Sequence, residues 1–270
     1  MVPERDWATL RETFSRQGAV HLPGALPAEA LADALGAYEW SLANPGPRAT
    51  RIRQATEGTF FNDLYNPDVM TGYRAMLEAS PLPAQVARLW GGGPVWFMYE
   101  QVFLKEGEAA RRTPWHQDSS YLAIAGRDLA VAWIPFEPLA AADSLEFIPG
   151  SHLGPLYNGS RFELGDDTAP LHPDSSLPRL PDIEAGRDAW EIISFDVAPG
   201  DVVIFHPQIL HGGAATRDGA RRRTLTLRFF GEDSYYDQRE GGAGPPVKGF
   251  HQRMKAGDRF RDPSFLQLLA

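Results

Sequence analysis

The chain has 270 residues, a formal net charge of −9 and no cysteine, with 43% hydrophobic and 23% charged residues. This is globular composition, and the length is enough to bury a core without disulfides. The lack of cysteine excludes thiolate metal sites and cysteine nucleophiles. The acidic balance argues against nucleic acid and anionic membranes as partners. No run resembles a signal peptide or a membrane span, so we expect a cytoplasmic protein.

The first part of the chain, residues 1–93, is expected to be mainly helical. Apolar residues recur at helical spacing over residues 7–14, and a proline in its usual first-turn place opens a helix over residues 27–42. A short extended run, residues 19–22, separates the two. One further helix is predicted over residues 68–90, and three consecutive glycines end it.

The following part, residues 94–235, favours strands because its apolar runs are rich in aromatic and β-branched side chains. Turn residues separate these runs, which cover residues 95–104, 129–136, 144–149, 192–195, 201–205 and 223–230. Many short strands after a helical block predict a mainly β protein with flanking helices, as a barrel or a double-sheet jelly roll. No repeat or linker is evident, so we expect a single domain over residues 1–270, with its β core over about 94–235.

One segment within the β core has only weak periodicity. Residues 154–188 are rich in proline, aspartate, glycine and serine. Loops of this length are often functional, so we predict a lid over a site. A disordered insertion is the alternative.

The main chemical signal is the sequence His116-Gln-Asp118. In a strand, residues i and i+2 point to the same face, so an imidazole and a carboxylate would lie side by side. His211 follows the apolar run 201–205, which would bring it to the end of a sheet. Two histidines and one carboxylate form the facial triad of non-haem ferrous oxygenases, which leaves three positions open. Zinc would accept the same ligands.

Three consecutive arginines, Arg221, Arg222 and Arg223, follow His211 by ten to twelve residues and open an apolar strand. They are either solvated residues at the strand end, or one of them points inward and binds a dicarboxylate. Alternation places Arg222 on one face with two threonines and Arg228, and its neighbours on the leucine face. If the leucine face pointed inward, Arg221 or Arg223 would be the arginine that binds the dicarboxylate. We expect instead a polar interior, in which the threonines and arginines face the site and the leucines pack against the outer helices. We therefore predict Arg222.

These motifs together resemble the phytanoyl-CoA dioxygenase family. The resemblance rests on Trp115-His-Gln-Asp118, residues 147–152 (FIPGSH), residues 199–205 (PGDVVIF), His211-Gly-Gly and Arg222, and it extends over about residues 10–235. The family comprises ferrous iron and 2-oxoglutarate dependent oxygenases. The resemblance implies a double-stranded β-helix, which is a jelly roll with flanking helices.

The resemblance also implies roles for single residues. His116, Asp118 and His211 match the iron ligands, and Arg222 matches the arginine that binds the C5 carboxylate of 2-oxoglutarate. Trp133 matches an aromatic residue of the co-substrate site. Two further residues match polar positions around the co-substrate or substrate, namely Thr113 and Gln101. The direction of Lys105 stays open, and His152 is expected to be structural.

The implied reaction consumes O2 and 2-oxoglutarate, releases succinate and CO2, and hydroxylates or desaturates a small-molecule metabolite. Halogenation is disfavoured, because halogenating relatives replace the carboxylate ligand that Asp118 retains. An acidic chain offers no basic platform for a coenzyme A thioester, which favours a small free metabolite. The candidate substrate contacts are Phe61, Asn62, Tyr99, Tyr121 and Arg111.

Two other functions remain open. A cupin-type metal-dependent hydrolase or isomerase needs the triad but has no use for Arg222 at that position. A non-catalytic binding member of the same fold is the second alternative. Ferrous iron and 2-oxoglutarate added without air would separate the oxygenase from the hydrolase, through the visible absorption band of the chelated keto acid.

Overall fold

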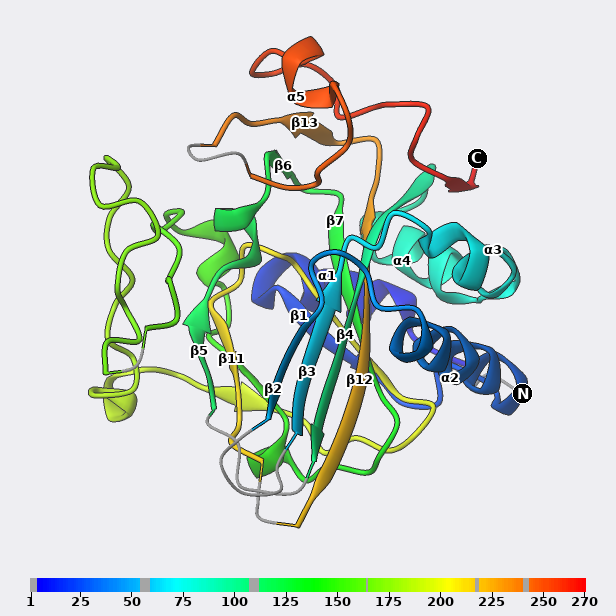
Figure 1. The fold of residues 1–270 in the computed structure, drawn as a ribbon, viewed down its shortest axis with the longest axis horizontal. Helices are drawn as coiled ribbons and strands as arrows, with labels where there is room; N and C mark the ends of the chain where they lie inside the picture. The colour runs from blue at the N-terminus through cyan, green and yellow to red at the C-terminus, as the bar shows by residue number, and fades with distance from the viewer. Residues whose placement is uncertain (1–3, 54–58, 107–111, 164, 217–218, 240–242) are drawn as a thin grey trace.

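A computed structural model describes residues 4–53, 59–106, 112–163, 165–216, 219–239 and 243–270 (Figure 1). Two antiparallel sheets form its core. The larger has the order β1-β10-β7-β12-β4-β3-β2, with β14 also paired to β4, and the smaller has the order β5-β11-β8-β9. A further two-stranded sheet pairs β13 with β6. The prediction of a mainly β protein with flanking helices is confirmed.

The strands of the larger sheet come from all parts of the chain. They are β1 (Ala19–Leu22), β2 (Thr50–Arg53), β3 (Thr59–Leu64), β4 (Val95–Glu106), β7 (Leu129–Pro135), β10 (Val202–Phe205), β12 (Arg221–Phe230) and β14 (Gln267–Leu269). The smaller sheets contain β5 (Thr113–His116), β6 (Ile124–Gly126), β8 (Leu145–Phe147), β9 (Ile193–Ser194), β11 (His211–Gly213) and β13 (Ser234–Tyr236).

Helices cover one face of the larger sheet (Figure 1). They are α1 (Trp7–Gln17), α2 (Ala28–Ala43), α3 (Val69–Ala79) and α4 (Leu82–Trp90), and a short α5 (Phe250–Arg253) lies near the C-terminus. The main hydrophobic cluster joins Tyr38 and Tyr73 of these helices to Leu225 and Leu227 of β12. The opposite face of the sheet is therefore the one turned towards the smaller sheet. In the part of the chain that the structure describes, no helix combines the length and apolar character needed to cross a bilayer.

The prediction of one helix over residues 68–90 is wrong, because two helices meet at Ser80 and Pro81. Ser80 has ψ 141, an extended conformation. The residue before a proline is driven out of the helical region by the proline ring, which ends α3 one residue earlier. The first 93 residues also contribute β2 and β3 to the sheet, and these two strands are additional to the predicted run 19–22.

The segment 154–188 lies beside the smaller sheet and contains turns and isolated bridges. It is anchored by buried apolar side chains such as Ile183 and by charged contacts. Glu184 accepts hydrogen bonds from Arg112 and from the indole of Trp115. The described part of the segment is therefore folded against the β core.

Candidate metal centre and co-substrate site

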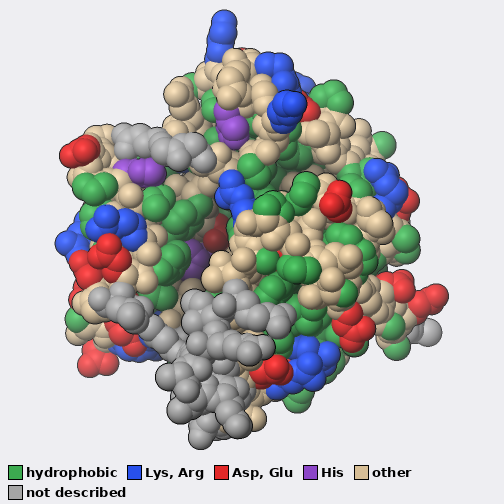
Figure 2. Space-filling model, viewed as in Figure 1, with side chains coloured by type: hydrophobic (Ala, Val, Ile, Leu, Met, Phe, Trp, Pro, Cys, Tyr) green, Lys and Arg blue, Asp and Glu red, His purple; other side chains and the backbone are tan. Residues whose placement is uncertain are grey.

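The predicted metal ligands meet where two strands of the smaller sheet pair. His116 ends β5 and His211 begins β11, and the two are direct partners across the antiparallel pair. Direct partners present their side chains on the same face, and the ring centroids lie 4.2 Å apart. Asp118 completes a set whose donor atoms all lie within 4.8 Å of one another. The surface is hollowed here, with histidine and carboxylate side chains at the base (Figure 2).

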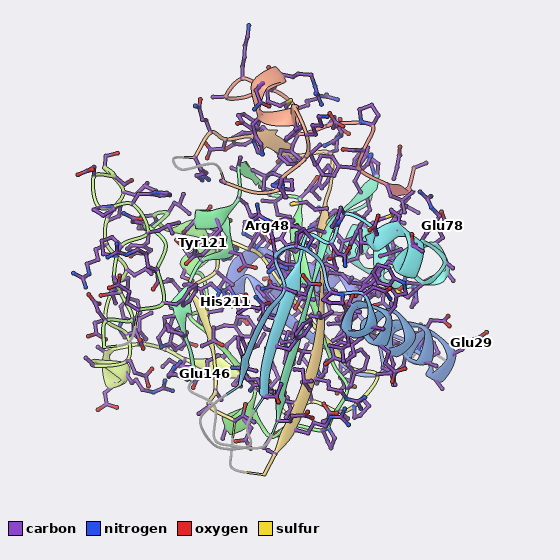
Figure 3. The ribbon with its side chains drawn as sticks, viewed as in Figure 1. Glu29, Arg48, Glu78, Tyr121, Glu146 and His211 are labelled. Atoms are coloured by element: carbon purple, nitrogen blue, oxygen red, sulfur yellow. The ribbon has the colours of Figure 1, made fainter. Side chains whose placement is uncertain are left out.

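The local structure around these ligands differs from the sequence prediction. Asp118 is not in a strand, since β5 ends at His116 and Asp118 begins the 3-10 turn η1 (Asp118–Tyr121). The extended conformation of Gln117 (φ −117, ψ 126) carries the alternation one residue further, so Asp118 still faces His116. His211 is not at the end of the strand over 202–205 but opens β11 after a turn (Figure 3).

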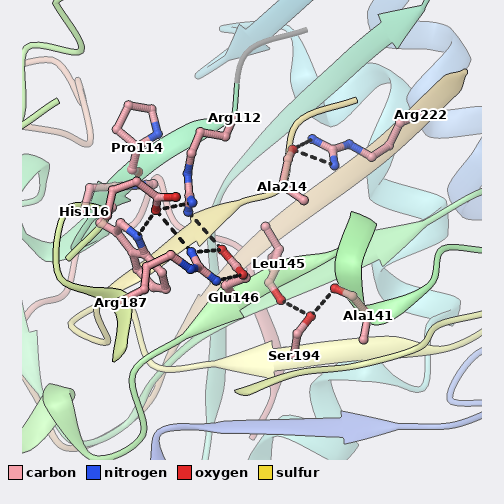
Figure 4. Close-up of polar contacts among 12 residues, drawn as sticks. Arg112, Pro114, His116, Ala141, Leu145, Glu146, Arg187, Ser194, Ala214 and Arg222 are labelled. Atoms are coloured by element: carbon pink, nitrogen blue, oxygen red, sulfur yellow. Dashed lines mark hydrogen bonds and ion pairs between the residues drawn. The ribbon is translucent and has the colours of Figure 1, made fainter. Parts of the chain in front are cut away.

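Backbone carbonyls set the tautomers of both imidazoles. Nδ1 of His116 lies 2.8 Å from the Pro114 carbonyl oxygen (Figure 4). Nδ1 of His211 lies 3.0 Å from the Ile209 carbonyl oxygen. A carbonyl only accepts, so each Nδ1 carries the hydrogen and each Nε2 keeps its lone pair. The two Nε2 atoms lie 3.5 Å and 4.0 Å from Oδ1 of Asp118.

The charges of the donors suit a divalent ion. Burial, and then the neighbouring His116, lower the pKa of His211 to about 3, so this imidazole is neutral at neutral pH. Burial alone would raise the pKa of Asp118, but the Arg228 guanidinium and the two histidines hold it well below its usual range. Neutral imidazole and ionised carboxylate are the forms that bind metal, so the donor set fits ferrous iron.

Arg228 is a site residue whose role the sequence did not reveal. Its Nη2 and Nε atoms donate to Oδ2 of Asp118 at 2.8 Å and 3.2 Å. Nη2 also donates to Oε1 of Gln101 at 2.9 Å, and Nε2 of Gln101 donates to Asn62 at 3.0 Å. Gln101 and Asn62 therefore lie beside the metal site, linked to it through Arg228. The alternation along β12 did place Arg228 on the inner face, but its partner is 110 residues away in sequence.

The inner face of β12 is polar, as the sequence predicted. Thr224, Thr226 and Arg228 are buried on it, whereas Leu225 and Leu227 pack in the helix-facing core. Of the three consecutive arginines, Arg222 is buried and donates to the carbonyl oxygen of Asp143 at 2.9 Å. It also donates to that of Ala214 at 3.2 Å (Figure 4). The other two form ion pairs on the outer face, Arg221 with Glu106 and Arg223 with Glu137.

Two more predicted residues, Trp133 and Thr113, and also Lys105, whose direction the sequence left open, lie on strands that pair with the strands of Arg222 or His211. Lys105 is the direct partner of Arg222 in the sheet and is buried. Trp133 pairs with Thr226 and belongs to the cluster that contains Phe205, whose ring centroid is 4.7 Å from that of His211. Thr113 pairs with Gly213 two residues after His211.

The candidate substrate contacts divide into three groups. Tyr121 lies near the site, with its ring centroid 6.3 Å from that of His116, and Tyr99 lies under the Arg228 guanidinium at 4.4 Å. Phe61 is wrongly placed in the prediction: alternation along β3 sends it away from the Asn62 side and into the helix-facing core. Arg111 falls outside the described residues.

A family model described as phytanoyl-CoA dioxygenase (PhyH) matches residues 14–224. The chain belongs to this family. A probable phytanoyl-CoA dioxygenase of Caenorhabditis elegans is 30% identical over 135 residues, which is 47% of this chain and 39% of that protein. The human peroxisomal phytanoyl-CoA dioxygenase is 26% identical over 134 residues, 48% of this chain and 37% of that protein. The matches thus cover well under two thirds of these relatives.

Solved structures confirm the double-stranded β-helix. The epimerase SnoN, solved with Fe3+, alpha ketoglutarate and nogalamycin RO, has a TM-score of 0.68 at 20% identity, covering 97% of this chain and 98% of SnoN. EctD from S. alaskensis with bound Fe has a TM-score of 0.63 at 18% identity, covering 95% and 88%. The chain thus has the family and fold that the sequence predicted, and its His-Asp-His donor set could hold a metal ion.

Proposed function

We propose that the chain is a dioxygenase that hydroxylates or desaturates a small molecule and converts 2-oxoglutarate and O2 into succinate and CO2. The observation that carries this proposal is the His116, Asp118, His211 donor set, with the buried cation Arg222 on the facing sheet. A bound ferrous ion would supply the activation of O2 there. The chain's own residues orient the two substrates and exclude water.

Two buried cations would bind the far carboxylate of 2-oxoglutarate. Arg222 and Lys105 are neighbours on the inner face, and the described hydrogen bonds of Arg222 go to backbone carbonyls. Burial lowers the pKa of Arg222 although the Asp143 carboxylate opposes this shift, and a further anion would stabilise two like charges buried side by side. A dicarboxylate that reaches towards the histidines supplies this charge. We assign Thr113 and Trp133 to the walls of the same site.

Aromatic side chains support a ring-containing substrate. The rings of Tyr121 and Phe162 stack with centroids 6.1 Å apart, and Phe162 meets the His116 ring edge-on at 5.4 Å. Phe162 is 40% exposed, so it can contact a ligand. Arg48, also exposed, lies over the Tyr65 ring at 5.4 Å (Figure 3). SnoN was solved with nogalamycin RO, and we propose a flat small molecule with a polar or anionic group here.

We further propose that the segment 154–188 is the lid of a single domain. Phe162 brings this segment to a metal ligand. Its far end is tied down by Arg187, which forms ion pairs with Glu146 and Glu184 (Figure 4). Such a lid keeps water from the reacting atoms. The cytoplasmic location and the lack of nucleic-acid and membrane partners stay predictions.

One experiment tests the reaction class. Ferrous iron and 2-oxoglutarate are added without air to the parent and to the His211→Ala variant, and visible absorption is recorded before and after air is admitted. We expect a charge-transfer band in the parent that the variant lacks, followed by succinate in air. No band in the parent would favour the cupin-type hydrolase or isomerase. A band without succinate, across a panel of metabolites, would favour a binding member.

A further inference from the structure

The two oxygens of Asp118 have different environments. Oδ1 lies 3.5 Å and 4.0 Å from the Nε2 atoms of His116 and His211, where a shared ion would sit. Oδ2 accepts two hydrogen bonds from Arg228, one from Nη2 at 2.8 Å and one from Nε at 3.2 Å. Arg228 thus donates two hydrogen bonds to Oδ2, and we call this pair of bonds the fork. The histidine Nε2 atoms lie beside the other oxygen, Oδ1.

The fork is held in place by contacts that do not involve Asp118. The guanidinium lies 4.4 Å from the centre of the Tyr99 ring, and its Nη2 donates to Oε1 of Gln101. The Gln101 amide is fixed in turn by Asn62 on β3. Arg228 is only 5% exposed, so water competes little for these bonds. These contacts therefore pre-position the guanidinium for its two hydrogen bonds to Asp118.

We propose that Arg228 is a positioning residue that keeps Asp118 a one-oxygen ligand of the metal. The inference rests on the proposed metal site. A carboxylate that is free to rotate can bind an ion through both oxygens, and the second oxygen then occupies a position that a co-substrate needs. Two donors on Oδ2 oppose that rotation, because binding through Oδ2 would break charge-assisted bonds. This leaves three positions open for 2-oxoglutarate and O2.

The same proposal changes the role of two predicted contacts. Gln101 and Asn62 were expected to contact the co-substrate or the substrate. In the structure the Gln101 amide donates to Oδ1 of Asn62 and accepts from Arg228. We assign both to the support of the fork, so their effect on the metal is transmitted through Arg228.

The decisive test compares the parent with Arg228→Lys, which keeps the charge but cannot form the fork. Crystals of both proteins are loaded with Mn2+ alone. We expect one Asp118 oxygen on the ion in the parent and two in the variant. One oxygen in both proteins would overturn the proposal, and so would two in the parent. This measurement needs neither 2-oxoglutarate nor turnover, so it decides the inference even where the proposed reaction fails.

A second measurement uses nitric oxide as a stand-in for O2 on the ferrous protein with 2-oxoglutarate bound, followed by electron paramagnetic resonance. With both proteins saturated with iron, we expect Arg228→Lys to weaken nitric oxide binding about tenfold, because the second Asp118 oxygen then competes for the position that nitric oxide needs. A merely structural arginine would lower thermal stability and leave nitric oxide binding by the iron-saturated protein unchanged, and that outcome would contradict the proposal.

Two further variants complete the set. Gln101→Leu removes the outer support but leaves Arg228, and we expect a smaller loss of nitric oxide affinity in the same direction; it also serves if Arg228→Lys does not fold. Arg223→Lys alters an ion pair with Glu137 on the outer face of the same strand and is the matched control. If Arg223→Lys lost as much nitric oxide affinity as Arg228→Lys, the result would contradict the proposal.

Discussion

Each ligand of the metal site owes its protonation state to what surrounds it. The Nδ1 atoms of both histidines face backbone carbonyls, and burial followed by the neighbouring His116 brings the pKa of His211 down to about 3. The Nε2 atom of His211 can therefore bind a metal ion at neutral pH without first losing a proton.

We expect His211→Ala to weaken ferrous iron binding by more than about a hundredfold, because losing a supporting contact of a metal ligand already costs ten- to a hundredfold. Anaerobic calorimetry measures this directly. His172→Ala, which changes a histidine outside the triad, is the control and should match the parent. Equal affinity in His211→Ala and the parent would show that this ligand is wrongly assigned.

The three consecutive arginines differ in burial, and that difference predicts their effects on 2-oxoglutarate. Arg222→Ala should weaken its binding roughly tenfold to a hundredfold, the equivalent of one charge-assisted pair of about 1.5–3 kcal/mol. Iron affinity should stay nearly intact. Arg221→Ala and Arg223→Ala should do little, since both residues pair with glutamates on the other face. The assignment of Arg222 is wrong if Arg223→Ala causes the large loss of affinity for 2-oxoglutarate and Arg222→Ala causes none. Titration of the charge-transfer band measures all three variants.

The buried Lys105 predicts that the binding of 2-oxoglutarate depends on pH. Burial, and then the neighbouring Arg222, lower its pKa to about 7. Below this pH Lys105 is charged and attracts a dianion, and above it the attraction is lost. Because a bound anion favours the charged form, the pKa rises in the complex. We expect 2-oxoglutarate to bind more weakly as the pH rises from about 6 to about 9, and Lys105→Met to remove most of this dependence. A parent whose affinity does not change with pH would contradict this role.

At the scale of elements, the segment 154–188 contacts the β core through an aromatic ring and through hydrogen bonds to a carboxylate. Phe162 reaches His116, and Glu184 accepts from Arg112 and Trp115. We expect limited proteolysis within this segment to slow when iron and 2-oxoglutarate, or its inert N-oxalyl analogue, are bound. Cleavage that is unchanged with substrate also present would count against a lid. Cleavage sites elsewhere in the same digest are the internal control.

The elements that could be predicted are those whose pattern is local. The strand β12 and its two faces follow from the alternation of threonine and leucine. The strand β3 was not predicted, because polar and apolar residues do not alternate regularly along it. Its inner face carries both Asn62 and Leu64. The sequence placed Arg228 on the inner face of β12 but did not reveal its role. That role depends on a hydrogen bond to Asp118, which only the folded chain brings near. Long-range pairing of this kind has no signature in a single sequence.

At the scale of the whole molecule, the larger sheet separates stability from chemistry. Its outer face carries Leu225 and Leu227 against the helices, and its inner face carries the polar site. We expect Leu227→Ala to lower the free energy of unfolding by about 2–5 kcal/mol and to leave iron affinity unchanged. Urea unfolding and calorimetry test the two halves of this statement. A large loss of iron affinity in the folded variant would show that the two faces are coupled.

The strand β12 carries two cations of the site, Arg222 and Arg228, on one face. A residue inserted between them would turn one guanidinium into the helix-facing core while the other stayed in the site, because side chains alternate. Replacement of single residues along the strand changes one contact at a time. A change in its length would break the binding of 2-oxoglutarate and the orientation of Asp118 together. Variation among functional descendants of this chain should therefore occur as substitutions in β12, with insertions and deletions confined to the loops at its ends.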